Sequence, residues 1–228
     1  FVEQFKKRVS RSATKKVVLW PDTFNNHFHP ATANAAADVL EAAGYEVLIP
    51  RKRLCCGRPL YDWGFLGMAK TLLRETMDAL KTELDEGIPI VGLEPSCISV
   101  FRDELPNLFA GDADAIRLSK AVKTLPEFLL EEEVKLPKLT GKALVQSHCH
   151  HKSILHFDDE EKVLKTLGLD VDHPDSGCCG MAGAFGFGFS CATFSDALNP
   201  YVSFFFVVVV NALVVVVDVV DVDVDGSP

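Results

Sequence analysis

The stretch "ADVLEAAGYEVLIPRKRLCCG" at residues 37–57 joins a predicted helix, a predicted strand and a Cys-Cys-Gly triplet. Its periodic apolar start predicts a helix that ends at Gly44, and "YEVLIP" (45–50) predicts a buried strand. A second stretch, "VLKTLGLDVDHPDSGCCG" (163–180), repeats the order. Five residues recur at identical intervals in the two stretches: Val39, Leu40, Gly44, Val47 and Pro50 match Val163, Leu164, Gly168, Val171 and Pro174. This repetition indicates a duplicated unit.

The rest of the chain alternates in the same way between strand and helix patterns. We predict strands at 15–21, 45–50, 89–93, 142–148 and 169–174. We predict helices at 31–43 and 64–84, and further helical stretches that end near residue 133 and at residue 167. The alternation predicts an α/β fold of two duplicated βαβ-type units, with mainly parallel strands and the cysteine loops at the strand carboxyl ends. The predicted divisions are a leader (1–14), a first unit (15–133), a linker (134–141), an apparently truncated second unit (142–196) and a tail (197–228).

Composition narrows the class of protein. The chain has 228 residues, 48% of them hydrophobic, and a formal net charge of −9 from 32 acidic and 23 basic side chains. A nucleic-acid partner is not expected from this charge. No secretory signal precedes the first strand, so we expect a cytoplasmic protein. Because the chain begins with Phe1, we also expect it to be a piece of a longer protein.

The tail differs from the rest of the sequence. Residues 202–228 are dominated by valine, and Asn211 interrupts the apolar run before it reaches the roughly 20 residues of a membrane helix. We interpret the tail as the product of a shifted reading frame or of poorly assigned residue types, and we draw no function from it.

The seven cysteines carry the chemical signal. In a reducing compartment, clustered cysteines bind metal or perform redox chemistry more often than they form a disulfide framework. Adjacent cysteines reach one site only from a turn, which Gly57 and Gly180 permit directly after each pair. Thiolates gathered on such loops suit a soft metal or an iron–sulfur cluster.

The motifs "LCCGRPLYDWG", "GLEPSCISVFRDEL", "HCHHK" and "GCCGMAGAFGF" together resemble the cysteine-rich CCG domain family. The resemblance extends over roughly residues 17–187. Members occur in heterodisulfide reductase and in the iron–sulfur parts of glycolate oxidase, glycerol-3-phosphate dehydrogenase and lactate-utilisation proteins. The chain is most similar to the C-terminal part of bacterial FAD-linked oxidases that carry iron–sulfur domains. The family unit is a cysteine, a gap, Cys-Cys-Gly, a second gap and Cys-x-x-Cys.

In the first unit the resemblance implies Cys55, Cys56 and Cys97 as metal ligands, with two departures from the pattern. Thr23 stands at the leading cysteine position, with 31 residues between it and Cys55, and Glu94 stands at the first position of Cys-x-x-Cys. The first site is therefore either vestigial or completed by a mixed ligand such as Glu94. Alternatively, Glu94 serves as an N-terminal carboxylate of the following helix.

In the second unit the resemblance implies a [4Fe–4S] cluster, with Gly180, like Gly57 in the first unit, shaping the loop around the cofactor. The four expected ligands are Cys149, Cys178, Cys179 and Cys191. Only 11 residues separate Cys179 from Cys191, which suggests a missing segment. Zinc is the alternative cofactor, because His148 and His150 flank Cys149. Strand alternation would place both histidines on the face opposite Cys149.

The resemblance implies the iron–sulfur electron-transfer portion of a flavin-linked oxidoreductase that acts on a 2-hydroxy acid such as lactate or glycolate. Because the chain lacks a dinucleotide fingerprint, the FAD is expected on another domain or subunit. This portion holds no catalytic residue of its own, and its partners are the flavin-containing oxidase component and an electron acceptor. Membrane association, at the inner face, is expected only through partners. Two alternatives remain: a zinc-binding or metal-free docking module, and a thiol–disulfide redox centre of the heterodisulfide type.

Overall fold

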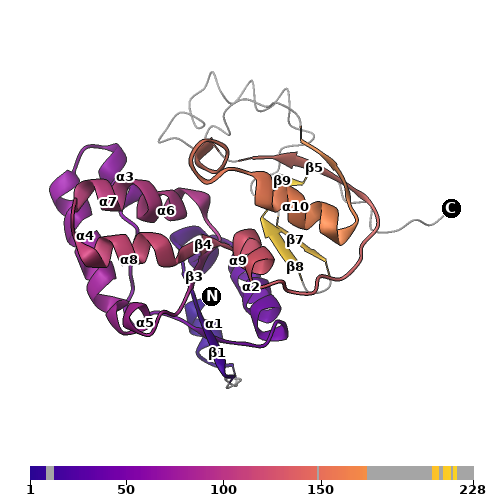
Figure 1. The fold of residues 1–228 in the computed structure, drawn as a ribbon, viewed down its shortest axis with the longest axis horizontal. Coiled ribbons are helices and arrows are strands. Elements are labelled where there is room, and N and C mark those ends of the chain that lie inside the picture. The colour runs from indigo at the N-terminus through magenta and orange to yellow at the C-terminus, as the bar shows by residue number, and fades with distance from the viewer. Residues whose placement is uncertain (9–12, 148, 174–206, 211–212, 217, 220–228) are drawn as a thin grey trace.

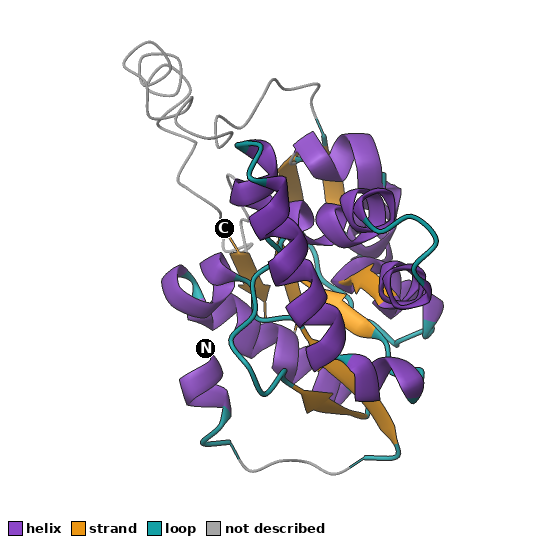
Figure 2. Ribbon diagram, turned by 90° about the vertical axis from the view of Figure 1, so that its left-hand side faces the viewer, coloured by secondary structure: helices purple, strands orange, loops and turns teal. Residues whose placement is uncertain are grey.

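The computed structural model describes residues 1–8, 13–147, 149–173, 207–210, 213–216 and 218–219. Figure 1 shows a larger body built on four strands beside a smaller one built on β5 and α10. Helices lie on both sides of the strands (Figure 2). The predicted α/β fold class is confirmed.

The first sheet has the strand order β2-β1-β3-β4, and all of its paired strands are parallel. Its strands are β1 (Lys15–Leu19), β2 (Tyr45–Leu48), β3 (Ile90–Gly92) and β4 (Val122–Thr124). Alternate residues along β1 enter different cores, with Val17 and Leu19 on one face and Val18 on the other. This is the arrangement of a parallel strand that helices cover on both faces.

Two hydrophobic cores fill the space between the sheet and its helices. One face of the sheet packs against α1 (Val2–Phe5), α2 (Pro30–Ala42) and α9 (Leu125–Glu131). The other face packs against α4 (Leu66–Ala79), α5 (Lys81–Asp85), α6 (Pro95–Ser99), η2 (Val100–Glu104), α7 (Leu105–Leu108) and α8 (Ala113–Ala121). Short elements η1 (Phe24–Phe28) and α3 (Arg58–Asp62) follow β1 and β2.

Two features of the first half differ from the sequence prediction. The single helix expected over 64–84 is divided at Leu80 into α4 and α5. Strand β4 lies within a region expected to be helical throughout, because three residues between two helices leave too short a pattern to detect.

The second half repeats the geometry of the first. β5 (Lys142–Gln146) pairs in parallel with β6 (Asp170–Asp172), as β1 does with β2, and α10 (Asp158–Leu167) joins them. Val171 pairs with Ala143, and its sequence match Val47 pairs with Val17. The matched glycines end equivalent helices with φ +90° at Gly44 and +97° at Gly168, a backbone region that favours glycine. The structure therefore supports the duplication inferred from the spacing.

The two halves share a core. Val163, Leu164 and Leu167 of α10 belong to the same buried cluster as residues of α2 and α9, which lie between the two bodies in Figure 1. The predicted linker is also packed: Leu139 contacts this core, and its N–H donates to the Leu167 carbonyl at 2.7 Å.

Part of the tail forms strands. β7 (Val207–Val210) pairs antiparallel with β8 (Leu213–Val216), and β9 (Asp218–Val219) pairs antiparallel with β5. Among the residues that the structure describes, no helix is both long enough and apolar enough to cross a membrane.

Candidate thiol and metal site

The strand order reverses its direction between β1 and β3. β1 connects through α2 to β2 on one side, whereas β3 continues to β4 on the other. Such a reversal opens a ligand-binding crevice at the strand carboxyl ends. Asp22 follows β1 there, and Glu94 and Cys97 follow β3. The loop after β2 adds Cys55 and Cys56, so the topology gathers the predicted first-unit residues at one edge.

The three thiols of the first unit form a contiguous group. Cys56 and Cys97 are buried, and their sulfur atoms lie 3.0 Å apart. Cys55 is half-buried, interacts with the Cys56 thiol, and accepts the Gly57 N–H at 3.5 Å. The predicted proximity of these cysteines is present in the fold.

All three thiols favour the protonated form. The hydrogen bond with Cys56, together with burial, raises the pKa of Cys55. The hydrogen bond with Cys55 lowers the pKa of Cys56, but its contact with Cys97 and its burial outweigh this effect and raise it. For Cys97 the Cys56 hydrogen bond lowers the pKa, but burial and the charges of Asp22 and Glu94 outweigh this effect and raise the pKa.

Glu94 caps α6. Its Oε1 accepts the Ser96 N–H at 3.2 Å and the Ser96 hydroxyl at 2.7 Å. Burial raises the pKa of Glu94, and the two Ser96 hydrogen bonds oppose that rise. This geometry corresponds to the capping alternative that the sequence left open for Glu94.

Asp22 is a site residue that the sequence analysis missed. Thr23, at the expected leading cysteine position, is exposed, whereas Asp22 is 2% exposed. Its carboxylate accepts the Asn25 N–H at 2.9 Å and the Asn25 side-chain amide at 2.8 Å. Burial raises the pKa of Asp22 to about 6, against the effect of these hydrogen bonds and with help from the nearby Glu94 charge.

Arg58 ties the triplet loop to α6, and it was also missed. Its guanidinium donates to the Ser96 carbonyl at 3.2 and 3.3 Å and to the Ser99 hydroxyl at 2.7 Å. It also pairs with the buried Glu104. No local pattern signals this role, because its partners on α6 and η2 lie 38 to 46 residues along the chain.

The turn after the cysteine pair depends on Gly57, whose φ is +81°. We expect Gly57→Ala to lower the free energy of unfolding by about 1–2 kcal/mol, because an L-residue is strained in this region. A Cβ there would meet Ala69 at no less than 3.7 Å, so backbone strain dominates. Urea unfolding measures the change.

The control is Gly67→Ala in α4, where no atom lies within 4 Å and φ is not positive. This variant should be neutral or stabilising. Equal losses in both variants would contradict the assignment.

Gly92 allows α6 to approach the sheet. A Cβ at Gly92 would lie 2.0 Å from Ile98 Cδ1, beside Cys97. Because Gly92 has no side chain, α6, which carries Cys97, packs close against the end of β3.

The second unit brings one described cysteine to this edge. Cys149 is exposed and follows β5. The next element, η3 (His151–Leu155), packs its Leu155 into the same core as Cys56 and Cys97. β5 ends at Gln146, so strand alternation does not extend to His150, whose Nδ1 lies 3.7 Å from the Cys149 sulfur. The other predicted residues of this unit lie outside the described residues: His148, Cys178, Cys179, Gly180 and Cys191.

A buried histidine anchors η3. His151 Nε2 lies 2.7 Å from Glu160 Oε1 of α10, and both side chains are less than a tenth exposed. η3, which begins at His151, also contacts α6 of the first half. The loop that carries Cys149 is thus held against the helix that carries Cys97.

The sequence matches the family described as "Cysteine-rich domain" (CCG) over residues 22–102 and 156–199. The chain belongs to the CCG cysteine-rich domain family. Each matched CCG segment contains one Cys-Cys-Gly triplet, in agreement with the duplication. Cys149 lies outside both segments, whereas Asp22 is the first matched residue.

Several curated proteins are similar in sequence to this chain. Lactate utilization protein A of Bacillus velezensis is 31% identical over 75% of this chain and 74% of its own length. D-2-hydroxyglutarate dehydrogenase of Pseudomonas putida is 30% identical over 75% of this chain but 17% of its own length. One subunit of the anaerobic glycerol-3-phosphate dehydrogenase of Escherichia coli is 28% identical over 75% and 45%, respectively. The chain therefore spans less than half of the latter two relatives.

The donor set of the first CCG unit does not fit a four-thiolate cluster. It offers three thiols, Glu94 is engaged as a helix cap, and Thr23 lies on the surface. Within the described part of the chain, no group of three or more His, Cys, Asp or Glu side chains is arranged to hold a metal ion. A vestigial first site stays a prediction, as does completion of the site by a mixed ligand.

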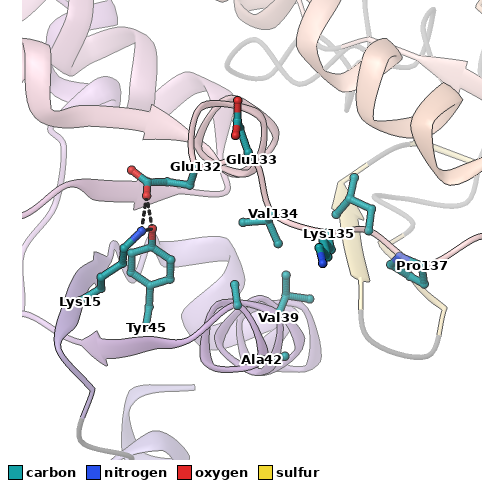
Figure 3. Close-up of a pocket in the computed structure, with 11 residues that line it drawn as sticks. Lys15, Val39, Ala42, Tyr45, Glu132, Glu133, Val134, Lys135 and Pro137 are labelled. Atoms are coloured by element: carbon teal, nitrogen blue, oxygen red, sulfur yellow. Dashed lines mark hydrogen bonds and ion pairs between the residues drawn. The ribbon is translucent and has the colours of Figure 1, made fainter.

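A separate depression lies at the opposite, amino-terminal edge of the sheet (Figure 3). It measures about 370 Å³ and is lined mainly by α2 and by residues 132–137. Lys15 donates to Glu132 at 3.0 Å and to the Tyr45 hydroxyl at 3.3 Å. These polar groups satisfy one another, so the depression is a packing feature between β1 and the segment that leads to the second half.

Proposed function

We propose that this chain is the iron–sulfur electron-transfer portion of an oxidoreductase that acts on a 2-hydroxy acid. The observation that carries the proposal is membership of the CCG family together with cysteine loops at the carboxyl edge of a doubly wound sheet. Relatives named for lactate and for 2-hydroxyglutarate support the substrate class, since both compounds are 2-hydroxy acids.

In this proposal the second unit holds a [4Fe–4S] cluster through Cys149, Cys178, Cys179 and Cys191. When bound, such a cluster supplies one-electron redox chemistry. The chain's own contribution is positional: β5 presents Cys149 at the sheet edge, and the η3 contacts hold its loop against α6. The first unit serves as the scaffold that the second unit packs against.

A flavin-containing oxidase domain or subunit is the proposed electron donor. It would take an electron pair from the substrate and pass single electrons to the cluster. The relative named as a subunit supports a division of labour between components. The final acceptor would receive the electrons from this chain.

Metal analysis of the full chain tests the proposal. Purified and reconstituted anaerobically, it should contain about four iron and four acid-labile sulfide per chain, and reduction should produce an electron paramagnetic resonance signal. Zinc without iron would instead select a zinc-stabilised docking module and overturn the electron-transfer role. Failure to incorporate either iron or sulfide would overturn it as well.

A further inference from the structure

We propose that Cys56 and Cys97 of the first unit form a reversible disulfide, and that Cys55 is the thiol through which they exchange with low-molecular-weight disulfides. The site belongs to the half whose donor set does not suit a cluster. It is independent of the cofactor proposed for the second unit.

The geometry of the sulfur pair carries the proposal. Cys56 lies in the triplet loop and Cys97 in α6, 41 residues later, yet their sulfur atoms are 3.0 Å apart. A disulfide bond needs a separation of about 2.05 Å, so the sulfurs must approach by roughly 1 Å. Side-chain rotation supplies a shift of this size without separating the two elements.

The surrounding structure already holds the two elements together. Arg58, two residues after Cys56, bonds to Ser96 and Ser99 on either side of Cys97. Ile98, next to Cys97, is fully buried against Gly92. Folding therefore already brings the two cysteines together, and formation of the disulfide costs little additional chain entropy.

Access to the buried pair runs through Cys55. Cys56 and Cys97 are 4% and 8% exposed, so a dissolved disulfide does not reach them directly. Cys55 is half-buried and interacts with the Cys56 thiol. The three sulfurs thus form a path from the surface to the interior.

A disulfide RSSR reacts with the three thiols in turn. The Cys55 sulfur, losing its proton to solvent, attacks RSSR; the Cys55–SR bond forms, and the first RSH leaves. The Cys56 sulfur then attacks Cys55 and releases the second RSH. Finally the Cys97 sulfur attacks Cys56, forming Cys56–Cys97 and returning the Cys55 thiol. Two protein thiols are oxidised, and RSSR is reduced to two RSH. The strain of a bond between adjacent cysteines favours the last step.

Glutathione disulfide is the probe for the test. The full chain, with its metal content measured, is incubated anaerobically with the probe over hours, because the raised thiol pKa values make exchange slow. We expect the loss of two free thiols, and peptide mapping should find Cys56 linked to Cys97. Reduction by dithiothreitol should restore both thiols.

Three variants locate the exchange. Cys55→Ser should slow formation of the link by roughly tenfold or more without changing the final product. Cys97→Ser should leave glutathione on Cys55 or a Cys55–Cys56 bond. The matched control, Cys149→Ser, should form the link as the parent chain does, because Cys149 belongs to the other half.

Three results would overturn the proposal. The first is a parent chain in which Cys56 and Cys97 stay unlinked at every ratio of glutathione disulfide to glutathione. The second is metal bound by the first-unit thiols, shown by iron or zinc that Cys97→Ser loses and Cys149→Ser retains. The third is an unchanged rate in Cys55→Ser, which would remove Cys55 from the path.

Discussion

Cys149→Ser should abolish incorporation of the iron–sulfur cluster, reducing iron and acid-labile sulfide to background and removing the paramagnetic signal of the reduced protein. The expectation rests on the proposed function, because a cubane cluster needs four thiolates and the second unit offers four cysteines. Serine is nearly isosteric, and Cys149 is exposed, so the variant should fold normally. Loss of the cluster would then report on ligation and not on folding.

The matched control is Cys97→Ser in the first unit. Its thiol contacts Cys56 inside the core, and three first-unit thiols cannot complete a cubane. This variant should retain the full iron and sulfide content of the parent chain. A Cys149→Ser variant that also retained them would remove Cys149 from the ligand set, a specific risk because Cys149 lies outside the segments that match the family.

Local sequence patterns predicted the parts of the fold that are themselves local. The helix that ends at Gly44 and the strand after it form as expected, because a positive-φ glycine and a β-branched run act within a few residues. The repeat around Gly168 was equally visible. β4 was not, since Val122–Thr124 is stabilised as a strand by pairing with β3, a contact 32 residues away in the sequence.

The residues of the candidate site were likewise predicted only in part. Cysteine spacing placed Cys55, Cys56 and Cys97 at one edge, because parallel strands end on the same side of a sheet. The sequence did not single out Asp22, because its neighbour Thr23 occupies the expected ligand position. Only the Asp22–Asn25 turn decides which of the two side chains faces inward. The capping role of Glu94 was open until the position of Ser96 was known.

Arg58→Met should lower the free energy of unfolding by about 3–5 kcal/mol, because it leaves the Glu104 carboxylate buried without its counter-charge. The side chains of Arg58 and Glu104 are only 10% and 6% exposed, so solvent screens their interaction little. The variant also removes the hydrogen bonds that reach Ser96 and Ser99. Urea unfolding of the full chain measures the loss.

Two controls separate the buried pair from the substitution itself. Arg117→Met removes an arginine that is 39% exposed and pairs with exposed Asp85, so it should cost no more than about 1 kcal/mol. Adding Glu104→Met to Arg58→Met removes the stranded charge and should recover most of the lost stability. If Arg58→Met cost no more than Arg117→Met, or if the double variant recovered nothing, Arg58 would not be the residue that holds the triplet loop to α6. Arg58→Lys should recover only part of the stability, because an ammonium group lacks the planar fork that reaches Ser96, Ser99 and Glu104 together.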